Sequence, residues 1–317
     1  TIRDFLALRL KMQLCDWAYL NLIDTFAKAF CGHGNEAVIM AAFIYSQSGY
    51  KMRLGRDCEK LYLLYGSKHG IYEKGYIVIE GINYYPLDDK VERMEISDFS
   101  FPQEQSMSLY IENAQKFTIR PSAKRKLASE QYHDVTIDSQ VNLNLIQFYN
   151  TYPSSEVNGN FMTRWKMYAD TPMDESVSQM LYPDIKNKIE GLSDVQAVNQ
   201  ILNWVQTAFQ YEYDDKVWGH DRAFFAEETL YYPYCDCEDR AILFTRLVRD
   251  LLGLKCILVY YPGHLASAVC LKQQVNGDYI SLDGDVYTIC DPTYIGAPVG
   301  ITMPEMDNRS AKVIKLL

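Results

Sequence analysis

The sequence predicts an α+β fold in which an amphipathic helix packs on an antiparallel sheet. Apolar residues recur at helical spacing from Ala241 to Leu252, and Gly253 follows as a helix stop. Four strand-like segments come next, at residues 255–260, 265–271, 278–282 and 286–290. Asn-Gly at 276–277 and Asp-Gly at 283–284 supply tight turns between the last three segments, which predicts an antiparallel meander.

Composition and charge limit the classes of function. The chain has 317 residues, of which 48% are hydrophobic and 23% are charged, as in ordinary globular proteins. Its net charge of −10 argues against nucleic acid or an anionic membrane as the main partner, and the basic run 124–126 is expected to be a solvated loop. No apolar run reaches membrane-spanning length, so we expect no membrane insertion. The sequence does not indicate the oligomeric state.

No motif indicates a compartment or a metal. The numbering starts at Thr1 rather than at Met, so export or a place in the cell envelope is open if an N-terminal segment was removed; otherwise we expect the cytoplasm. The 8 cysteines show no regular framework. Cys235 and Cys237 stand too close together for the usual paired zinc ligands, and no second pair follows, so we expect no structural metal and no cofactor.

Three polar residues border the predicted helix and strands. Cys237 lies where the apolar helix begins, and the unpaired N–H groups and the helix dipole there are expected to stabilise a thiolate and lower its pKa. His264 opens a strand-like run after Pro-Gly, and Asp291 follows the last strand. A helix with an N-terminal Cys can pack on a sheet that carries His and Asp. The pattern therefore predicts a nucleophile, its base and a group that orients the base.

This arrangement resembles a known superfamily. The shared features are, in order, Cys-x-Asp-x-Ala at 237–241, Gly253, His264 before a strand, and Asp-Pro-Thr at 291–293. They closely resemble the transglutaminase-like (papain-like cysteine protease) superfamily, over roughly the third of the chain from Ser193 to Tyr294. The resemblance implies a papain-like core with Cys237 as the nucleophile, His264 as the general base and Asp291 as the orienting acid. The family usually has a small residue just before its Cys motif, which leaves Cys235 as a competing nucleophile.

Each of these residues also has a plainer structural interpretation. Cys237 could be a small buried hydrophobe at a helix cap, but its two acidic neighbours and the polar run before it predict partial exposure and favour a nucleophile. His264 could be a turn residue that bonds the backbone. Asp291 could form an Asx turn before Pro292, which is a common use of Asp-Pro. The order of the three motifs favours the catalytic interpretation.

An acyl-transfer reaction also needs donors for the developing oxyanion. The N–H of Cys237 is the first candidate because of its place at a helix start. Gln206 is the side-chain candidate, with Trp204 and Tyr234 as alternatives that are more often core residues.

The segment before the Cys motif is predicted to be a helix and a functional loop. Ser193 and Gln196 form the sequence pattern of a capping box. The residues that share one face of the helix are Val198, Ile201, Leu202, Val205 and Phe209. Residues 211–229 are polar and aromatic without periodicity. A loop of that length is usually functional, so we expect it to border a cleft before Cys237.

The N-terminal third repeats part of the same pattern. A shift of 204 residues aligns Cys31 with Cys235, Ala37 with Ala241, Gly49 with Gly253, Lys51 with Lys255 and Leu54 with Leu258. After a one-residue deletion, residues 84–88 align with residues 287–291. The reactive pair is lost, because His33 and Lys60 stand at the Cys and His positions, and only Asp88 remains. The repeat predicts a degenerate, inactive copy of the fold.

These observations predict three parts of the chain. Residues 1–95 form a degenerate transglutaminase-like domain, residues 96–165 a β-rich connecting module, and residues 166–317 a transglutaminase-like catalytic domain. Within the module, residues 143–152 fit either a strand or a helix. The tail 295–317 is expected to wrap the surface.

Three functions of different classes fit the sequence. The first is a cysteine-dependent acyl-transfer enzyme that acts on amide bonds of a peptide or protein. Hydrolysis is favoured over cross-linking, because the multidomain flanks of cross-linking enzymes are missing. The second is a catalytically silent binding or scaffold protein built from papain-like domains. The third, a thiol redox protein that uses Cys235 and Cys237, ranks last because no Cys-x-x-Cys pattern is present.

Overall fold

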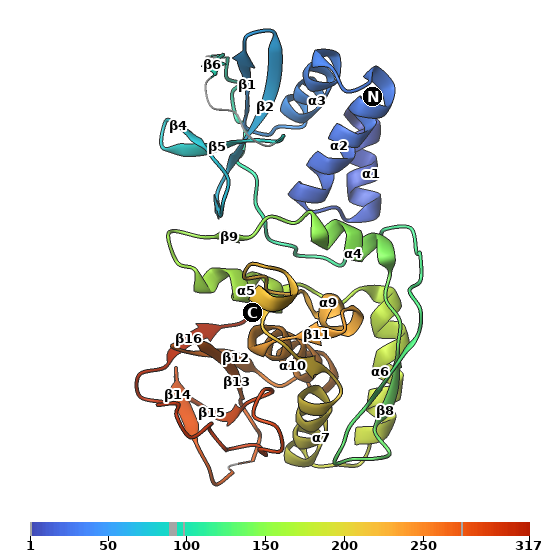
Figure 1. Cartoon of the computed structure of the whole chain (residues 1–317), viewed down its shortest axis with the longest axis vertical. Helices are drawn as coiled ribbons and strands as arrows, with labels where there is room; N and C mark the ends of the chain where they lie inside the picture. The colour runs from blue at the N-terminus through green and yellow to red at the C-terminus, as the bar shows by residue number, and fades with distance from the viewer. Residues whose placement is uncertain (1, 89–93, 98, 274) are drawn as a thin grey trace. The chain divides into compact units, whose positions relative to one another are not determined.

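The computed structural model describes residues 2–88, 94–97, 99–273 and 275–317, and the chain divides into two compact units (Figure 1). Residues 1–117 and 151–164 form the first unit, and residues 118–150 and 165–317 form the second. Both units combine helices with antiparallel sheets, which agrees with the α+β class. Within the described residues, no helix has both the length and the apolar character needed to cross a bilayer.

In its described residues, the first unit contains three complete helices and a five-stranded sheet. The helices are α1 (Ile2–Met12), α2 (Asp16–Cys31) and α3 (Asn35–Gln47). The strands are β1 (Met52–Asp57), β2 (Lys60–Ser67), β4 (Ile77–Ile79), β5 (Ile82–Pro86) and β6 (Glu95–Ile96), in the order β4-β5-β2-β1-β6. Helix α3 packs on β1 and β2. The short strand β3 (Gly70–Ile71) pairs separately with β9 (Ser155–Glu156).

The second unit surrounds one long buried helix with shorter ones. Its helices are α4 (Leu143–Asn150), α5 (Met162–Asp170, which begins in the first unit), α6 (Glu175–Ile189), α7 (Asp194–Thr207), α8 (Asp214–Val217), α9 (Ala226–Tyr231) and α10 (Cys237–Leu252). Helices α7 and α9 pack on α10. The capping box of Ser193 and Gln196 opens α7 as the sequence predicts.

The sheet of the second unit corrects the predicted meander. Its strands are β12 (Cys256–Tyr261), β13 (His264–Val269), β14 (Tyr279–Leu282), β15 (Asp285–Cys290) and β16 (Lys312–Lys315). The order is β14-β15-β13-β12-β16, so β15 rather than β14 lies beside β13. The predicted turn at 283–284 joins β14 to β15, and both of its residues have positive φ, at 53° and 88°. Part of the tail, expected to wrap the surface, instead adds β16 to the edge of β12.

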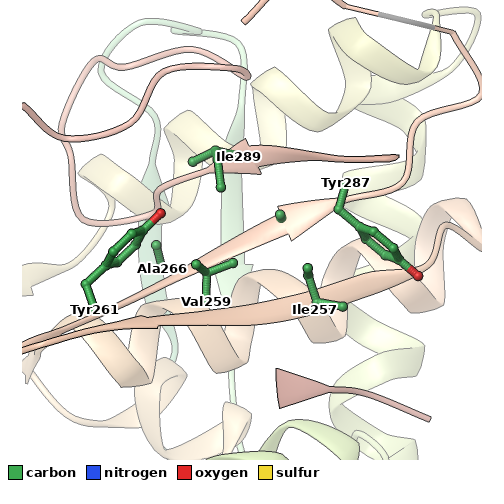
Figure 2. Packing of buried hydrophobic residues seen from close by; sticks show 7 residues of the cluster. Ile257, Val259, Tyr261, Ala266, Tyr287 and Ile289 are labelled. Carbon is green, nitrogen blue, oxygen red and sulfur yellow. The ribbon is translucent and has the colours of Figure 1, made fainter. Parts of the chain in front are cut away.

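Both faces of the central strands are buried. One face of β12 and β13 packs on α10. Figure 2 shows the core cluster, which consists of Ile257, Val259, Tyr261, Ala266, Ala268, Tyr287 and Ile289. Because alternate side chains point to opposite faces of a strand, 257, 259 and 261 share one face and leave 256, 258 and 260 for the other. A fully buried aliphatic or aromatic side chain contributes about 1.5–3 kcal/mol, so this double burial fixes the strands that carry the site.

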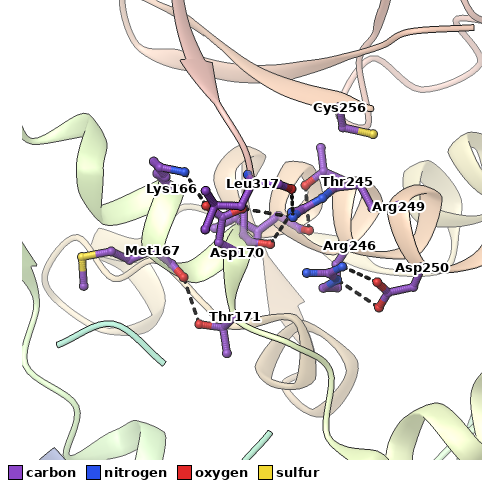
Figure 3. Close-up of polar contacts among 12 residues, drawn as sticks. Lys166, Met167, Asp170, Thr171, Thr245, Arg246, Arg249, Asp250, Cys256 and Leu317 are labelled. Atoms are coloured by element: carbon purple, nitrogen blue, oxygen red, sulfur yellow. Dashed lines mark hydrogen bonds and ion pairs between the residues drawn. The ribbon is translucent and has the colours of Figure 1, made fainter. Parts of the chain in front are cut away.

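A polar cluster holds the C-terminal end of α10 in place (Figure 3). Arg249 donates to the carbonyl oxygens of Ala169 (2.9 Å) and Leu317 (2.6 Å) and pairs with Asp170 (3.1 Å). The N–H of Leu317 donates to the same Asp170 carboxylate (2.9 Å). These bonds join α5, α10 and the residues after β16, so this end of α10 is held by partners remote in sequence.

The predicted module at 96–165 is not a separate unit. Residues 96–117 and 151–164 belong to the first unit, and residues 118–150 belong to the second. The backbone of Gln105 bonds to Gly49 and Lys51, which ties this stretch to the first sheet. The module is not β-rich either. Its strands β7 (Arg125–Ala128), β8 (Thr136–Ser139) and β9 are short, and residues 143–150 of the ambiguous segment form α4.

The two five-stranded sheets have the same strand order. The order β4-β5-β2-β1-β6 matches β14-β15-β13-β12-β16 strand for strand, with a helix, α3 or α10, before each hairpin. Strands β12 and β13 begin 204 residues after β1 and β2, at 256 and 264 against 52 and 60. The shift is the one that aligns the sequence repeat, so topology and sequence point to the same duplicated pattern.

Candidate active site

Cys237 is the first residue of α10, as the sequence predicts. The helix begins there because Asp239 Oδ2 accepts a hydrogen bond from the N–H of Asp236 (3.1 Å). It ends at Gly253, whose φ of 64° allows the left-handed turn that stops a helix. Since Cys237 occupies the first helical position, its N–H has no partner within the helix. This N–H is available to a bound group.

The imidazole of His264 and the carboxylate of Asp291 meet, although they come from different strands. His264 opens β13 directly after the turn at Gly263, whose φ is 79°. Asp291 follows β15, and the pairing of Ser267 with Cys290 brings these ends of the two strands together. The His264 Nε2 lies 2.8 Å from Asp291 Oδ2, and both side chains are buried. The carboxylate therefore holds the ring in one orientation.

Asp291 also forms the turn that its plainer interpretation predicts. Its Oδ1 accepts hydrogen bonds from the N–H groups of Thr293 (2.9 Å) and Tyr294 (3.2 Å). The other oxygen, Oδ2, is the one bonded to His264. The turn and the contact with the imidazole do not compete, because each uses a different oxygen of one carboxylate.

The sulfur of Cys237 lies against the start of β13. The N–H of Leu265, the residue after His264, hydrogen-bonds to this sulfur. Helix α10 and strand β13 thus bring the thiol beside the residue that follows the imidazole. The thiol itself donates to Glu238 Oε2, at 3.2 Å. In the part of the chain that the structure describes, no hydrogen bond joins the thiol to the imidazole.

The surroundings of Cys237 raise the pKa of its thiol well above the usual value. Burial is the largest cause, because the side chain is only 9% exposed, and the charges of Glu238 and Asp236 add to it. The N–H of Leu265 acts in the opposite direction. The expected lowering of this pKa is therefore wrong. Burial and two neighbouring carboxylates outweigh the partial positive charge of about one half at the helix start.

Glu238→Gln is expected to make Cys237 react faster with iodoacetamide. The variant removes a negative charge and the acceptor of the thiol, so the pKa of the thiol falls and more thiolate is present at a given pH. In the wild type the rate rises with pH only as the raised pKa is approached. In the variant the same rise comes at lower pH, and the rate near neutral pH is expected to be about tenfold higher.

The measurement is the alkylation rate of Cys237 across a pH series, followed by peptide mass spectrometry. Glu175→Gln is the matched control, because Glu175 also lies in the first turn of a helix but is exposed. Coinciding profiles for Glu238→Gln and the wild type would show that Glu238 does not govern the thiol.

Gln206 has a different role from the predicted oxyanion donor. Its Nε2 donates to the carbonyl oxygens of Asp291 (2.9 Å), Tyr294 (2.9 Å) and Ala297 (3.0 Å). Its Oε1 accepts from the N–H of Gly296 (3.1 Å), and the side chain is 1% exposed. Both ends of its amide group are therefore occupied. Gln206 fastens the loop that carries Asp291 and does not face a substrate.

Gln206→Ala is expected to destabilise the second unit by about 2–4 kcal/mol. The change leaves buried carbonyl groups of the 291–297 loop without a donor and opens a cavity beside α7. The free energy of unfolding is measured by urea denaturation followed by tryptophan fluorescence. Gln210→Ala, at an exposed position shortly after α7, is expected to change it by less than about 0.5 kcal/mol. Equal losses for the two variants would contradict this role.

Cys235, the competing nucleophile, is enclosed by protein. Its side chain is 3% exposed, and Arg240 Nε donates to its sulfur at 3.4 Å. Burial raises the pKa of this thiol to about 12. Cys235 and Cys237 are both free thiols, so they do not form a disulfide here. These contacts favour a structural role for Cys235.

The sequence pattern assigned no role to Tyr211 or Glu238. Tyr211 pairs with Cys235 where the short parallel strands β10 (Gln210–Tyr211) and β11 (Tyr234–Cys235) meet. Burial raises the pKa of the Tyr211 hydroxyl, and the nearby acidic groups Cys237 and Asp236 raise it further, so the hydroxyl stays protonated and can donate. The only sequence signal was the polar and aromatic composition of residues 211–229.

The first unit holds an amide where the second holds the thiol. Helix α3 begins at Asn35, 202 residues before Cys237, so the two helix starts correspond although the 204-residue shift aligns Cys237 with His33. The Oδ1 of Asn35 accepts from the N–H of Leu61 (2.9 Å), as the sulfur of Cys237 does from Leu265, 204 residues further on. Its Nδ2 donates to the carbonyl of Glu59 (2.6 Å). This helix start closes the hairpin turn but offers no nucleophile.

Comparisons of the chain with protein-family models, curated proteins and solved structures found no match in any of the three. The functional argument therefore depends on the residues and contacts of the site itself.

Proposed function

We propose that the protein is a cysteine-dependent acyl-transfer enzyme that hydrolyses amide bonds of a peptide or protein. The observation that carries the proposal is the 2.8 Å contact of His264 Nε2 with Asp291 Oδ2, with Cys237 at the start of α10, the helix that packs on β13. Cys237 acts as the nucleophile, His264 as the base and acid, and Asp291 as the group that orients the ring.

The proposed reaction has two halves. His264 takes the thiol proton, the sulfur of Cys237 attacks the carbonyl carbon, and a C–S bond forms. The imidazolium, held by Asp291, then protonates the leaving amine as the C–N bond breaks. In the second half His264 removes a proton from water, the resulting hydroxide attacks the thioester, and the C–S bond breaks. The acid product leaves, and the thiol regains its proton.

Two donors support the tetrahedral intermediates. The N–H of Cys237 has no partner within α10, because it belongs to the first turn of the helix. The hydroxyl of Tyr211 is the proposed second donor, in place of Gln206, because Tyr211 pairs with Cys235, two residues before Cys237. Amide bonds are the proposed substrates because the acidic chain, with its net charge of −10, is poorly suited to polyanions.

Acylation by p-nitrophenyl acetate tests the proposal. This activated ester needs no specific substrate pocket, and the expected result is a burst of one nitrophenolate per chain with an acetyl group on the peptide that contains Cys237. Because the pKa of the thiol is raised, the series runs from about pH 7 to about pH 10. A folded protein that never acylates at Cys237 over this range would contradict the enzyme and support the silent binding protein.

A further inference from the structure

A cluster of carboxylates lies at the start of α10. Asp214 opens α8, Asp221 follows it, and Asp236, Glu238 and Asp239 come from the helix start. All but Asp221 are buried. One oxygen each from Asp214, Asp236 and Asp239 lie within 4.8 Å of one another, and so do oxygens of Asp214, Asp221 and Glu238. Two chain segments thus direct their acidic groups to one small volume.

Three carboxylates of this cluster, those of Asp236, Glu238 and Asp239 at the α10 start, have no ion pair with a lysine, arginine or histidine among the described residues. Arg240, the next residue of the helix, turns away and donates to the carbonyls of Gln206 (3.1 Å) and Phe209 (2.7 Å). Buried carboxylates that lie this close together are costly without a counter-ion.

One buried oxygen in the cluster has no hydrogen-bond partner. The Oδ1 of Asp236 forms no hydrogen bond with the described residues, although the side chain is only 8% exposed. By contrast, both oxygens of Asp239 accept backbone N–H groups, from Phe224 (2.8 Å) and Asp236 (3.1 Å). Buried polar atoms are nearly always satisfied in folded proteins. An unsatisfied carboxylate oxygen that belongs to a converging acidic cluster indicates a place for a cation.

We propose that Asp214, Asp236 and Asp239, with Glu238 and Asp221 beside them, form a site for one Ca²⁺ ion. Carboxylate oxygens are the ligands of hard divalent cations. Four or five carboxylates suit Ca²⁺, which takes six to eight oxygens in flexible geometry, better than Mg²⁺, which usually keeps water and one or two carboxylates. The sulfur of Cys237 also converges with Asp236 and Glu238, but a soft sulfur ligand suits Ca²⁺ poorly, so Cys237 is left out of the proposed site. The sequence prediction of no metal followed from the spacing of the thiols, which does not bear on carboxylate ligands.

A cation here would also change the hydrogen bonding of the Cys237 thiol. Glu238 Oε2 now accepts from the thiol of Cys237, and a cation that coordinates Glu238 competes for that oxygen. His264 then remains as the base for the sulfur. This consequence rests on the proposed function, whereas the cation site itself does not.

Calorimetry and terbium luminescence test the site directly. Calcium-free wild type is expected to bind one Ca²⁺ per chain. Tb³⁺, which substitutes for Ca²⁺, is expected to show emission sensitised by Tyr211, whose hydroxyl feels the charges of Asp236 and Glu238. Asp214→Asn is expected to weaken binding at least about tenfold. Asp215→Asn is the matched control, because Asp215 is the exposed neighbour outside the cluster, and binding should change less than about twofold.

A second variant keeps the test decisive if Asp214→Asn fails to fold. Asp236→Asn keeps the shape of the side chain, so in calcium-free buffer it is expected to fold with a Tm close to that of the wild type. The same variant should lose the Tm increase that Ca²⁺ gives the wild type. No heat of binding and no Tm shift in the wild type at millimolar Ca²⁺ would overturn the site. Neither readout depends on acylation of Cys237, so failure of the proposed enzyme would leave this result intact, and the reverse also holds.

Discussion

Cys237→Ala is expected to abolish the nitrophenolate burst and to lower the rate of any amide hydrolysis by about 10⁴–10⁶-fold. The variant removes the only atom in the proposed mechanism that forms a covalent bond with the substrate. The N–H of residue 237 and the His264–Asp291 pair remain, so weak binding of an acyl group is kept while the chemistry is lost. The measurement is burst amplitude together with the mass of the modified peptide.

The control for this variant is Cys235→Ser. A serine at 235 keeps an acceptor for Arg240, and the burst should keep its full amplitude because Cys235 is buried away from reagents. The reverse pattern, with the burst lost in Cys235→Ser and kept in Cys237→Ala, would show that Cys235 is the nucleophile. Thermal unfolding of both variants shows whether any loss reflects misfolding.

Asp291→Asn is expected to lower the acylation rate by about 10³–10⁴-fold while the chain stays folded. The asparagine keeps an oxygen for the N–H groups of Thr293 and Tyr294, so the turn survives. Its NH₂ group, however, donates to His264 Nε2, which forces the ring proton onto Nδ1. The imidazole then presents a donor where the thiol needs an acceptor. The loss comes from the wrong tautomer rather than from a changed fold.

The measurement is the pH profile of acylation beside the free energy of unfolding. Asp285→Asn is the matched control, because Asp285 lies on the same strand β15 and pairs with the exposed Lys255, and it should leave the profile unchanged. An Asp291→Asn variant that acylates at the wild-type rate would show that Asp291 only forms the turn and does not orient His264.

Local patterns predicted the elements of the site well. The helix start at Cys237, the stop at Gly253 and the turn at 283–284 all depend on neighbouring residues, and the structure has them at the predicted positions. The contact of His264 with Asp291 also follows from two strand ends that face the same edge. Short-range propensity is enough for features of this kind.

Features that depend on distant pairing were not predictable in this way. Strand β15 enters beside β13 and leaves β14 at the edge, which no turn residue indicates. Gln206 lay on the expected helix, but its partners are carbonyls of a loop 85 or more residues away in the chain. The raised pKa of Cys237 comes from burial and from the side chains of Glu238 and Asp236, and their enclosure depends on how residues 211–225 fold back. A sequence pattern gives charge and spacing but not solvent access.

The helix starts at Asn35 and Cys237 show which residue types the fold accepts at this position. The amide oxygen of Asn35 accepts from the N–H of Leu61, and the sulfur of Cys237 lies at the N–H of Leu265, the corresponding residue of the second hairpin. The sheet of the first unit has the same strand order with an amide at this position. The strand order therefore does not require a sulfur at this position, which leaves residue 237 free to serve the proposed chemistry.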